Sequence, residues 1–171
     1  MPLLAITVLG HDRPGIIAET TGALADLGLN IEDSTMTLLR GHFAMMLITD
    51  GPADPATVEG GLAGLTADGS LSVSVREVPP EAGMPGGASY LLSVHGGDRP
   101  GIVSSLAAEV ARVGGNITDL TTRLAGDLYV LAAEVDLPPL ADPDALTASL
   151  QSVAADLGVD VSLLPLESDE L

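Results

Sequence analysis

The sequence predicts an α+β fold made of two successive units, each with the element order β-α-β-β-α-β. Three observations support this prediction. A shift of 86 residues aligns the stretch from Ile6 to Asp50 with the stretch from Leu92 to Asp136 without a gap, and about a third of the positions are identical. Within each copy, short β-rich runs alternate with segments whose apolar residues recur at helical spacing. A segment rich in Pro and Gly, PPEAGMPGGAS, separates the two copies.

Each copy opens with a strand, a tight loop and a helix. The runs LLAITVL (3–9) and SYLLSVH (89–95) are apolar and rich in β-forming residues, which predicts strands. The segments 14–28 and 100–115 carry apolar residues at helical spacing and end in Gly, which predicts helices. Each unit therefore begins strand, loop, helix.

A hairpin, a second helix and a last strand complete each copy. Each hairpin is predicted from two β-rich runs with a short turn between them. In the first copy, RG separates the runs 29–39 and 42–50, and in the second, AGD separates the runs 116–124 and 128–137. Asp-Pro opens the predicted second helices, 54–69 and 142–158, where Asp suits the N-cap and Pro the first turn. Closing strands are predicted at 71–78 and 159–166.

This order predicts two ferredoxin-like units, each an antiparallel four-stranded sheet with two helices on one face. We place the first unit at residues 1–78, a Pro/Gly linker at 79–87, the second unit at 88–167 and an acidic tail at 168–171.

Composition excludes several classes of function. The chain has 24 acidic and 6 basic residues, a formal net charge of −18, so direct binding of nucleic acid is not expected. It has no Cys and no Lys, which removes thiolate, Schiff-base and cysteine-rich zinc chemistry. The amino terminus lacks the charged region of a secretory signal and no run is long enough to span a bilayer, so we expect a cytoplasmic protein.

The loop after the first strand has nearly the same sequence in both copies, GHDRPGI and GGDRPGI. Pro14 and Pro100 fit the first position of a helix, and Asp12 and Asp98 then fall at or beside the N-cap. Capping does not explain the glycine that follows each proline, because Gly in a first helical turn costs about 1 kcal/mol relative to Ala. Either a neighbouring strand approaches that backbone closely, or a small anion lies on the free N–H groups of the helix end.

Asparagine occurs twice in the chain, as Asn30 and Asn116, two residues after Gly28 and Gly114. A helix-ending role is one explanation, but the two glycines already serve it. An amide that both donates and accepts hydrogen bonds suits the recognition of a zwitterion.

The pattern DRPGI, a helix, G(L/G)NI.D, a hairpin and a final α-β resembles the ACT domain, a small ligand-binding module that regulates amino-acid metabolism. Two tandem copies without a catalytic domain resemble the glycine cleavage system repressor-like branch of that family. The resemblance covers both copies, nearly the whole chain outside the linker and tail.

The resemblance implies that an amino acid or similar effector binds where units pack side by side, between the loop of one unit and the start of strand two of its partner. Carried over by position, the ligand-binding residues are Asp12, Arg13, Gly15, Ile16 and Asn30 at the first site and Asp98, Arg99, Gly101, Ile102 and Asn116 at the second.

The physical roles of these residues follow from their chemistry. The α-carboxylate would lie on the N–H groups near Gly15 or Gly101, and the Asn of the facing unit would bond the carboxylate or the ammonium. Asp12 and Asp98 would pair with the ammonium or only cap the helix. Arg13 and Arg99 would attract the carboxylate or simply be solvated.

We therefore expect a regulatory sensor of an amino acid or related metabolite that acts on a protein partner, forms a homodimer and has no cofactor. No set of a nucleophile, base and metal site is visible, and His42 has no partner at metal-ligand spacing, so catalysis is not expected. The alternative is a ligand-free interaction or oligomerisation module that docks on a metabolic enzyme or a transcription regulator.

Overall fold

The computed structural model describes residues 2–82 and 86–167 and divides into two compact units, Met1–Ala82 and Gly83–Leu171. We describe each unit by itself. The predicted acidic tail, 168–171, lies outside the described residues, as does the central part of the predicted linker, 83–85.

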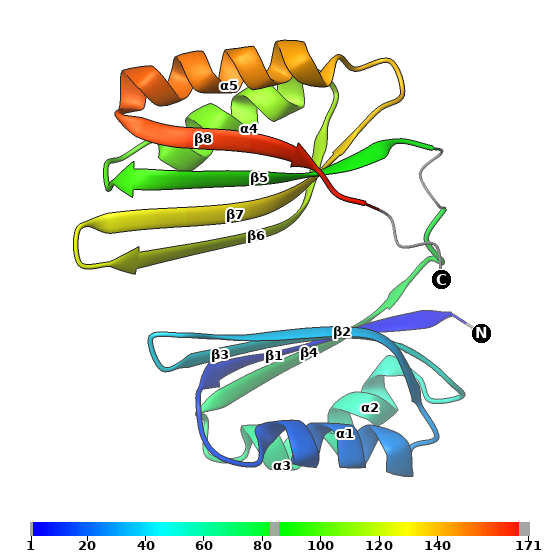
Figure 1. Ribbon diagram of the computed structural model, residues 1–171. Helices are drawn as coiled ribbons and strands as arrows, with labels where there is room; N and C mark the ends of the chain where they lie inside the picture. The colour runs from blue at the N-terminus through cyan, green and yellow to red at the C-terminus, as the bar shows by residue number, and fades with distance from the viewer. Residues whose placement is uncertain (1, 83–85, 168–171) are drawn as a thin grey trace. The chain divides into compact units, whose positions relative to one another are not determined.

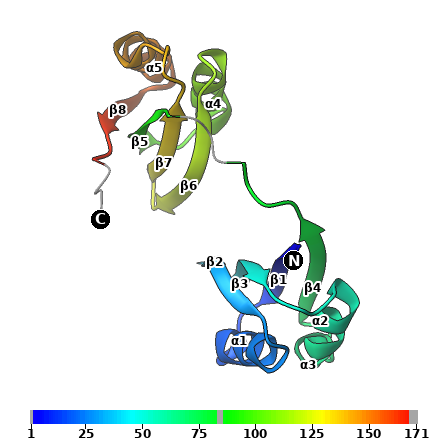
Figure 2. The same cartoon turned by 90° about the vertical axis from the view of Figure 1, so that its right-hand side faces the viewer.

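Unit 1 is an antiparallel four-stranded sheet of order β2-β3-β1-β4, with its helices on one face (Figures 1 and 2). The elements are β1 (Leu3–His11), α1 (Ile16–Asp26), β2 (Asn30–Leu39), β3 (His42–Asp50), α2 (Pro55–Gly61), α3 (Ala63–Thr66) and β4 (Leu71–Val78).

Unit 2 repeats this topology, with the strand order β6-β7-β5-β8. Its elements are β5 (Ala88–Gly97), α4 (Ile102–Arg112), β6 (Asn116–Ala125), β7 (Leu128–Leu137), α5 (Pro143–Leu157) and β8 (Val159–Pro165). The predicted α+β fold of two ferredoxin-like units is confirmed, including both hairpins and both closing strands.

Alternation along the central strands builds the core of each unit. In β1, Leu4, Ile6 and Val8 face the helices and are at most 1% exposed, because side chains two residues apart point to the same face of a strand. Ile16 and Leu24 on α1 pack against them. The core of unit 2 is equivalent, with Leu92 and Val94 on β5 and Ile102, Leu106 and Val110 on α4.

The start of the first helix differs from the prediction. α1 begins at Ile16 and α4 at Ile102, and their N-cap residues are Gly15 and Gly101, with φ of 89° and 93°. Pro14 therefore precedes the N-cap, and its predicted place in the first helical turn is wrong, as is that of Pro100. The cause is the left-handed glycine, which turns the chain after the proline before the helix starts.

The second helix is continuous in one unit only. Asp54 and Asp142 are the N-caps of α2 and α5, and each carboxylate accepts backbone N–H bonds, so the predicted Asp-Pro starts are confirmed. The predicted helix 54–69 is broken at Leu62 into α2 and α3. Three glycines lie in its interior, at 60, 61 and 64, and each lowers helix stability by about 1 kcal/mol relative to Ala.

Arg40 and Gly41 form the tight turn between β2 and β3, with φ of 49° and 84°. Positive φ at both turn residues is typical of the two-residue hairpin turn whose twist matches the flanking strands. Across residues 2–82 and 86–167, no helix has both the length and the apolar character to cross a membrane.

Candidate functional site

The loop of unit 1 leaves β1 at a position where only glycine fits. A Cβ on Gly10 would lie 2.1 Å from the backbone oxygen of Ser70, which accepts a bond of 3.1 Å from the N–H of His11. At the equivalent Gly96, a Cβ would lie 2.9 Å from Val159 Cγ1 and 3.0 Å from its Cα. These glycines fix how closely the loop approaches the last strand of its unit.

Gly15 and Gly101 have a different role. A Cβ on Gly15 would meet nothing within 4 Å, and one on Gly101 would meet only the hydroxyls of Ser104 and Ser105, at 3.9 Å. Of the two alternatives for this glycine, a close approach by a neighbouring strand is wrong. Positive φ is what requires glycine here, and the space beside each helix start is open.

Asp12 and Asp98 do not cap their helices. Neither α1 nor α4 has a side-chain hydrogen bond at its N-cap, so the capping interpretation of these carboxylates is wrong. Both residues are exposed. The N–H of Asp12 donates to the carbonyl of Gly41 at 3.0 Å, which ties the loop to the hairpin turn.

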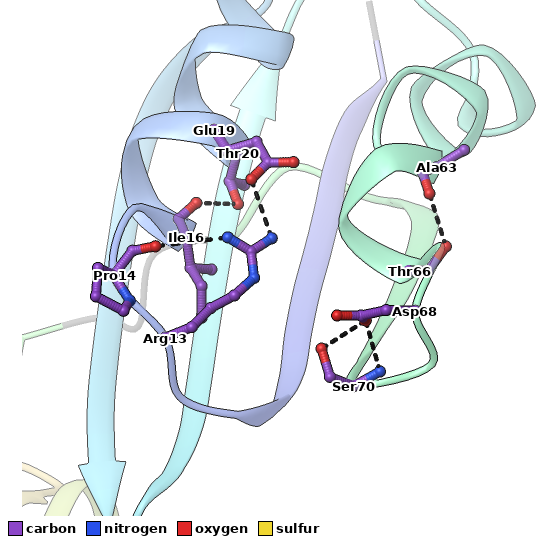
Figure 3. Close-up of polar contacts among 9 residues, drawn as sticks. All are labelled: Arg13, Pro14, Ile16, Glu19, Thr20, Ala63, Thr66, Asp68 and Ser70. Carbon is purple, nitrogen blue, oxygen red and sulfur yellow. Dashed lines mark hydrogen bonds and ion pairs between the residues drawn. The ribbon is translucent and has the colours of Figure 1, made fainter.

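The two arginines of the repeated motif have different partners. Arg13 forms an ion pair of 3.0 Å with Glu19 on the first turns of α1 (Figure 3). Arg99 is exposed, and its guanidinium lies 3.5 Å from the backbone oxygen of Asp156, near the end of α5. Sequence analysis missed Glu19, although Ser105 at the equivalent position of the second copy signals the difference.

Ile16 and Ile102 are 2% exposed and belong to the cores of their units. Their side chains are therefore committed to packing, and only their backbone N–H groups are left for a ligand. These groups belong to the first helical turn, where N–H groups lack intrahelical partners.

Asn30 and Asn116 lie at the opposite end of the sheet from the loop of their own unit. Each is the first residue of the second strand, and both are exposed. The loop lies at the start of α1, and this helix of 11 residues, about 16 Å long, runs from the loop toward Asn30. A small ligand therefore cannot contact the loop and the Asn of one unit together.

The start of the second strand carries further features that the sequence analysis missed. Asn30 pairs with Asp50 and Asn116 with Asp136, and both β2 and β6 have a register shift after the next pair along the strand. A bulge re-aims side chains and is common beside functional sites. The identity of Asp50 and Asp136 between the two copies was the signal that could have shown this.

A surface hollow lies near each of these strand ends. The hollow of unit 1 has a volume of about 470 Å³ and includes Glu32, Asp33 and Pro80 in its lining. That of unit 2 has a volume of about 380 Å³ and includes Ser89, whose hydroxyl donates to Asp136 at 2.6 Å.

The histidines form no site common to the two units. His11 and His42 face each other across β1 and β3, with ring centroids 6.5 Å apart, and His95 lies 3.4 Å from the carboxylate of Asp160. Within the described part of the chain, no group of three or more His, Asp or Glu side chains could hold a metal ion.

Two ferredoxin-like units, each with a glycine-turned loop before its first helix, define the class of this chain as a tandem α+β protein. Comparison with known families is consistent with this class. The sequence profile of the ACT domain matches residues 2–76 and 89–163, and the chain belongs to the ACT domain family. Membership of this family supports a regulatory, ligand-binding role.

Several relatives have names that describe their function or family. The glycine cleavage system transcriptional repressor of Escherichia coli is 30% identical over 121 residues, which cover 70% of this chain and 64% of the repressor. A UPF0237 protein of Methanopyrus kandleri is 46% identical over 50 residues, which cover 29% of this chain and 56% of that protein. The chain thus spans about half the length of such short curated relatives, 56% of this one and 49% of one from Streptococcus pneumoniae.

Solved structures match over the whole tandem. A protein from Galdieria sulphuraria has a TM-score of 0.82 at 29% identity, and the match covers 97% of this chain and 99% of that one. A protein provisionally described as a glycine cleavage system transcriptional repressor has a TM-score of 0.74 at 21% identity, covering 98% of both chains. At that identity the second match shows the fold alone.

Proposed function

We propose that this protein is a cytoplasmic, non-catalytic sensor that binds an amino acid or related small metabolite between ACT units and passes the result to a partner protein. One observation carries the proposal. The two copies keep the same loop and the same Asn, and each unit holds them at opposite ends of its sheet. A zwitterion contacts both only where two units meet.

The chemistry of the loop suits an amino acid. The α-carboxylate lies on the free N–H groups at the start of α1 or α4, where the helix dipole favours negative charge. The exposed Asp12 or Asp98 pairs with the ammonium group, and the Asn of the facing unit completes the polar contacts. The effector then favours the packing of units that completes its site, which couples binding to assembly.

Uncovered sheet faces support a homodimer. The helices of each unit cover one face of its sheet (Figure 1), and Leu9 and Met46 of unit 1 and Val130 and Leu164 of unit 2 are 40 to 59% exposed. Burial of such side chains against a second sheet is favourable. We therefore propose that these faces pack in a dimer.

The target is proposed to be a protein. The formal net charge of −18 disfavours the phosphate backbone of nucleic acid. The relative from Escherichia coli is a transcriptional repressor by name, and for this chain we propose that any effect on transcription passes through a bound protein.

A thermal-shift screen with the twenty amino acids tests the proposal. A ligand present at 100 times its dissociation constant stabilises the folded state by about 2.7 kcal/mol, which gives a clear rise in Tm. If no amino acid raises the Tm and calorimetry detects no heat of binding, the chain is not an amino-acid sensor, and the ligand-free module is favoured instead.

The variant Asn30→Ala/Asn116→Ala tests the assignment of the site. We expect weaker binding with little change in the Tm of the ligand-free protein, since both side chains are exposed. The control is Thr35→Ala/Thr121→Ala, which changes exposed residues of the same two strands. Equal affinity of the two double variants would remove the asparagines from the site.

A further inference from the structure

Arg13 in unit 1 lies beside the carboxylate of Glu19. Its Nη2 is 3.0 Å from Glu19 Oε2, and its Nη1 lies 3.5 Å from the carbonyl of Pro14. Glu19 and Arg13 are both partly solvated, with 45% and 35% of their side chains exposed. Figure 3 shows the Arg13 guanidinium turned toward Glu19.

A second carboxylate, Asp68, acts on the same arginine. Asp68 accepts bonds of 2.7 and 2.9 Å from the hydroxyl and N–H of Ser70. These bonds are the main reason that the pKa of Asp68 lies below its usual value, and the charge of Arg13 adds to the same shift. The ion pair with Glu19 is thus the contact that offsets the positive charge of Arg13.

Arg99 in unit 2 has a different environment. Position 105, equivalent to Glu19, is a serine, and its hydroxyl lies near Gly101 together with that of Ser104. The equivalent of Asp68 is Asp156, since each lies three residues before the last strand of its unit. The backbone carbonyl of Asp156 lies 3.5 Å from the guanidinium of Arg99. Among the residues that the structure describes, Arg99 forms no ion pair.

We propose that the two loops are unequal and that the carboxylate of the effector binds to Arg99 of unit 2, while Glu19 keeps Arg13 of unit 1 from taking it. This inference rests on the proposed function. A ligand carboxylate at Arg13 would have to displace Glu19 or lie beside it, and adjacent like charges repel. At Arg99 the ligand carboxylate replaces only water and a weak carbonyl contact. Glu19 therefore determines which of the two loops binds the carboxylate of the effector.

Two arginine variants of the full chain test which loop binds. The probe is whichever of the twenty amino acids gives the largest thermal shift with the wild-type protein, titrated by calorimetry. Because a hydrogen bond to a charged group is lost, we expect Arg99→Ala to raise Kd by about tenfold or more. Arg13→Ala should change Kd by less than about twofold, since its charge is already offset.

Exchange of the distinguishing residue between the loops gives a second test. Ser105→Glu places a carboxylate where unit 1 has Glu19, and we expect it to raise Kd by about threefold or more. The control is Ala111→Glu, which adds the same charge at an exposed position on another side of α4. Glu19→Ser should free Arg13 and add a second binding event per chain, whereas Glu59→Ser, on α2, should not.

The outcomes separate this inference from the function on which it rests. If none of the twenty amino acids binds to the wild-type chain, the proposed sensing of an amino acid fails and the inference falls with it. If one binds, and Arg13→Ala weakens it as much as Arg99→Ala, the loops are equal and the inference alone is overturned. The same holds if Ser105→Glu and Ala111→Glu have equal affinities while both keep the wild-type Tm.

Discussion

Replacement of Gly101 by alanine tests why the repeated motif needs glycine before the helix. The structure leaves open space for a Cβ at this position and places the residue at a φ of 93°. The cost should therefore be the conformational one alone, about 1–2 kcal/mol for a residue with a Cβ in the left-handed region. A unit of this size would lose about 4–8 °C in Tm for each kcal/mol.

Gly97 supplies the control for this experiment. It lies in β5, has no positive φ, and a Cβ there would also meet nothing within 4 Å. Gly97→Ala should leave the stability of unit 2 unchanged or slightly raised, because alanine lowers the entropy of the unfolded chain. The two variants thus differ in backbone conformation and not in crowding.

Tyrosine fluorescence measures the effect in the correct unit. The chain has two tyrosines and no tryptophan, and Tyr90 and Tyr129 both pack against the core of unit 2. Urea unfolding followed by this signal therefore reports the free energy of unfolding of unit 2. Equal stability of Gly101→Ala and Gly97→Ala would refute the conformational explanation, and a loss well above 2 kcal/mol would point to a steric contact instead.

Other substitutions test the cap, the core and the assembly. Asp54→Ala should lower the Tm, because Thr57 donates to this N-cap carboxylate at 2.7 Å and holds its pKa below the usual 3.8. A lowered folded pKa means that this stabilisation is present above the unfolded pKa and is lost as pH falls through the folded value, so the Tm difference from wild type should shrink in acid. Leu106→Ala, in the core of unit 2, should cost about 2–5 kcal/mol in urea unfolding, whereas Leu140→Ala, at a side chain 99% exposed, should cost less than about 0.5 kcal/mol. Light scattering should find a dimer, and a strict monomer at every concentration would contradict the proposed packing of sheet faces.

Most of the fold could be predicted because the information is local and repeated. Strand and helix periodicities differ, turn residues mark the hairpins, and two copies of one pattern support each other. Asp54 and Asp142 could be placed as caps from the Asp-Pro pairs, and the structure confirms both. The break at Leu62 could not be placed, since the sequence shows that glycines weaken a helix but not where it ends.

The geometry around the candidate site was less predictable than the fold. The glycine of DRPG was correctly singled out as more than a helix residue, yet the proline before it suggested a helix start two residues too early. The close approach of Gly10 to Ser70 joins residues that are far apart in the sequence, so local patterns could not show how the loop meets the last strand. The ion pair of Arg13 with Glu19 was also missed, because the sequence analysis compared the arginines and not their surroundings.

The break of the second helix of unit 1 into α2 and α3 affects how easily this part of the chain unfolds locally. These segments have 7 and 4 residues, whereas α5 in unit 2 has 15 and ends in a left-handed Gly158. Short helices depend on tertiary packing for nearly all of their stability, and such regions exchange their amide hydrogens first. Amide exchange should therefore be fastest, among the helices of the two units, over residues 55–66. In the duplicated chain, we therefore expect solvent to reach the backbone of α2 and α3 in unit 1 before it reaches the backbone of α5 in unit 2.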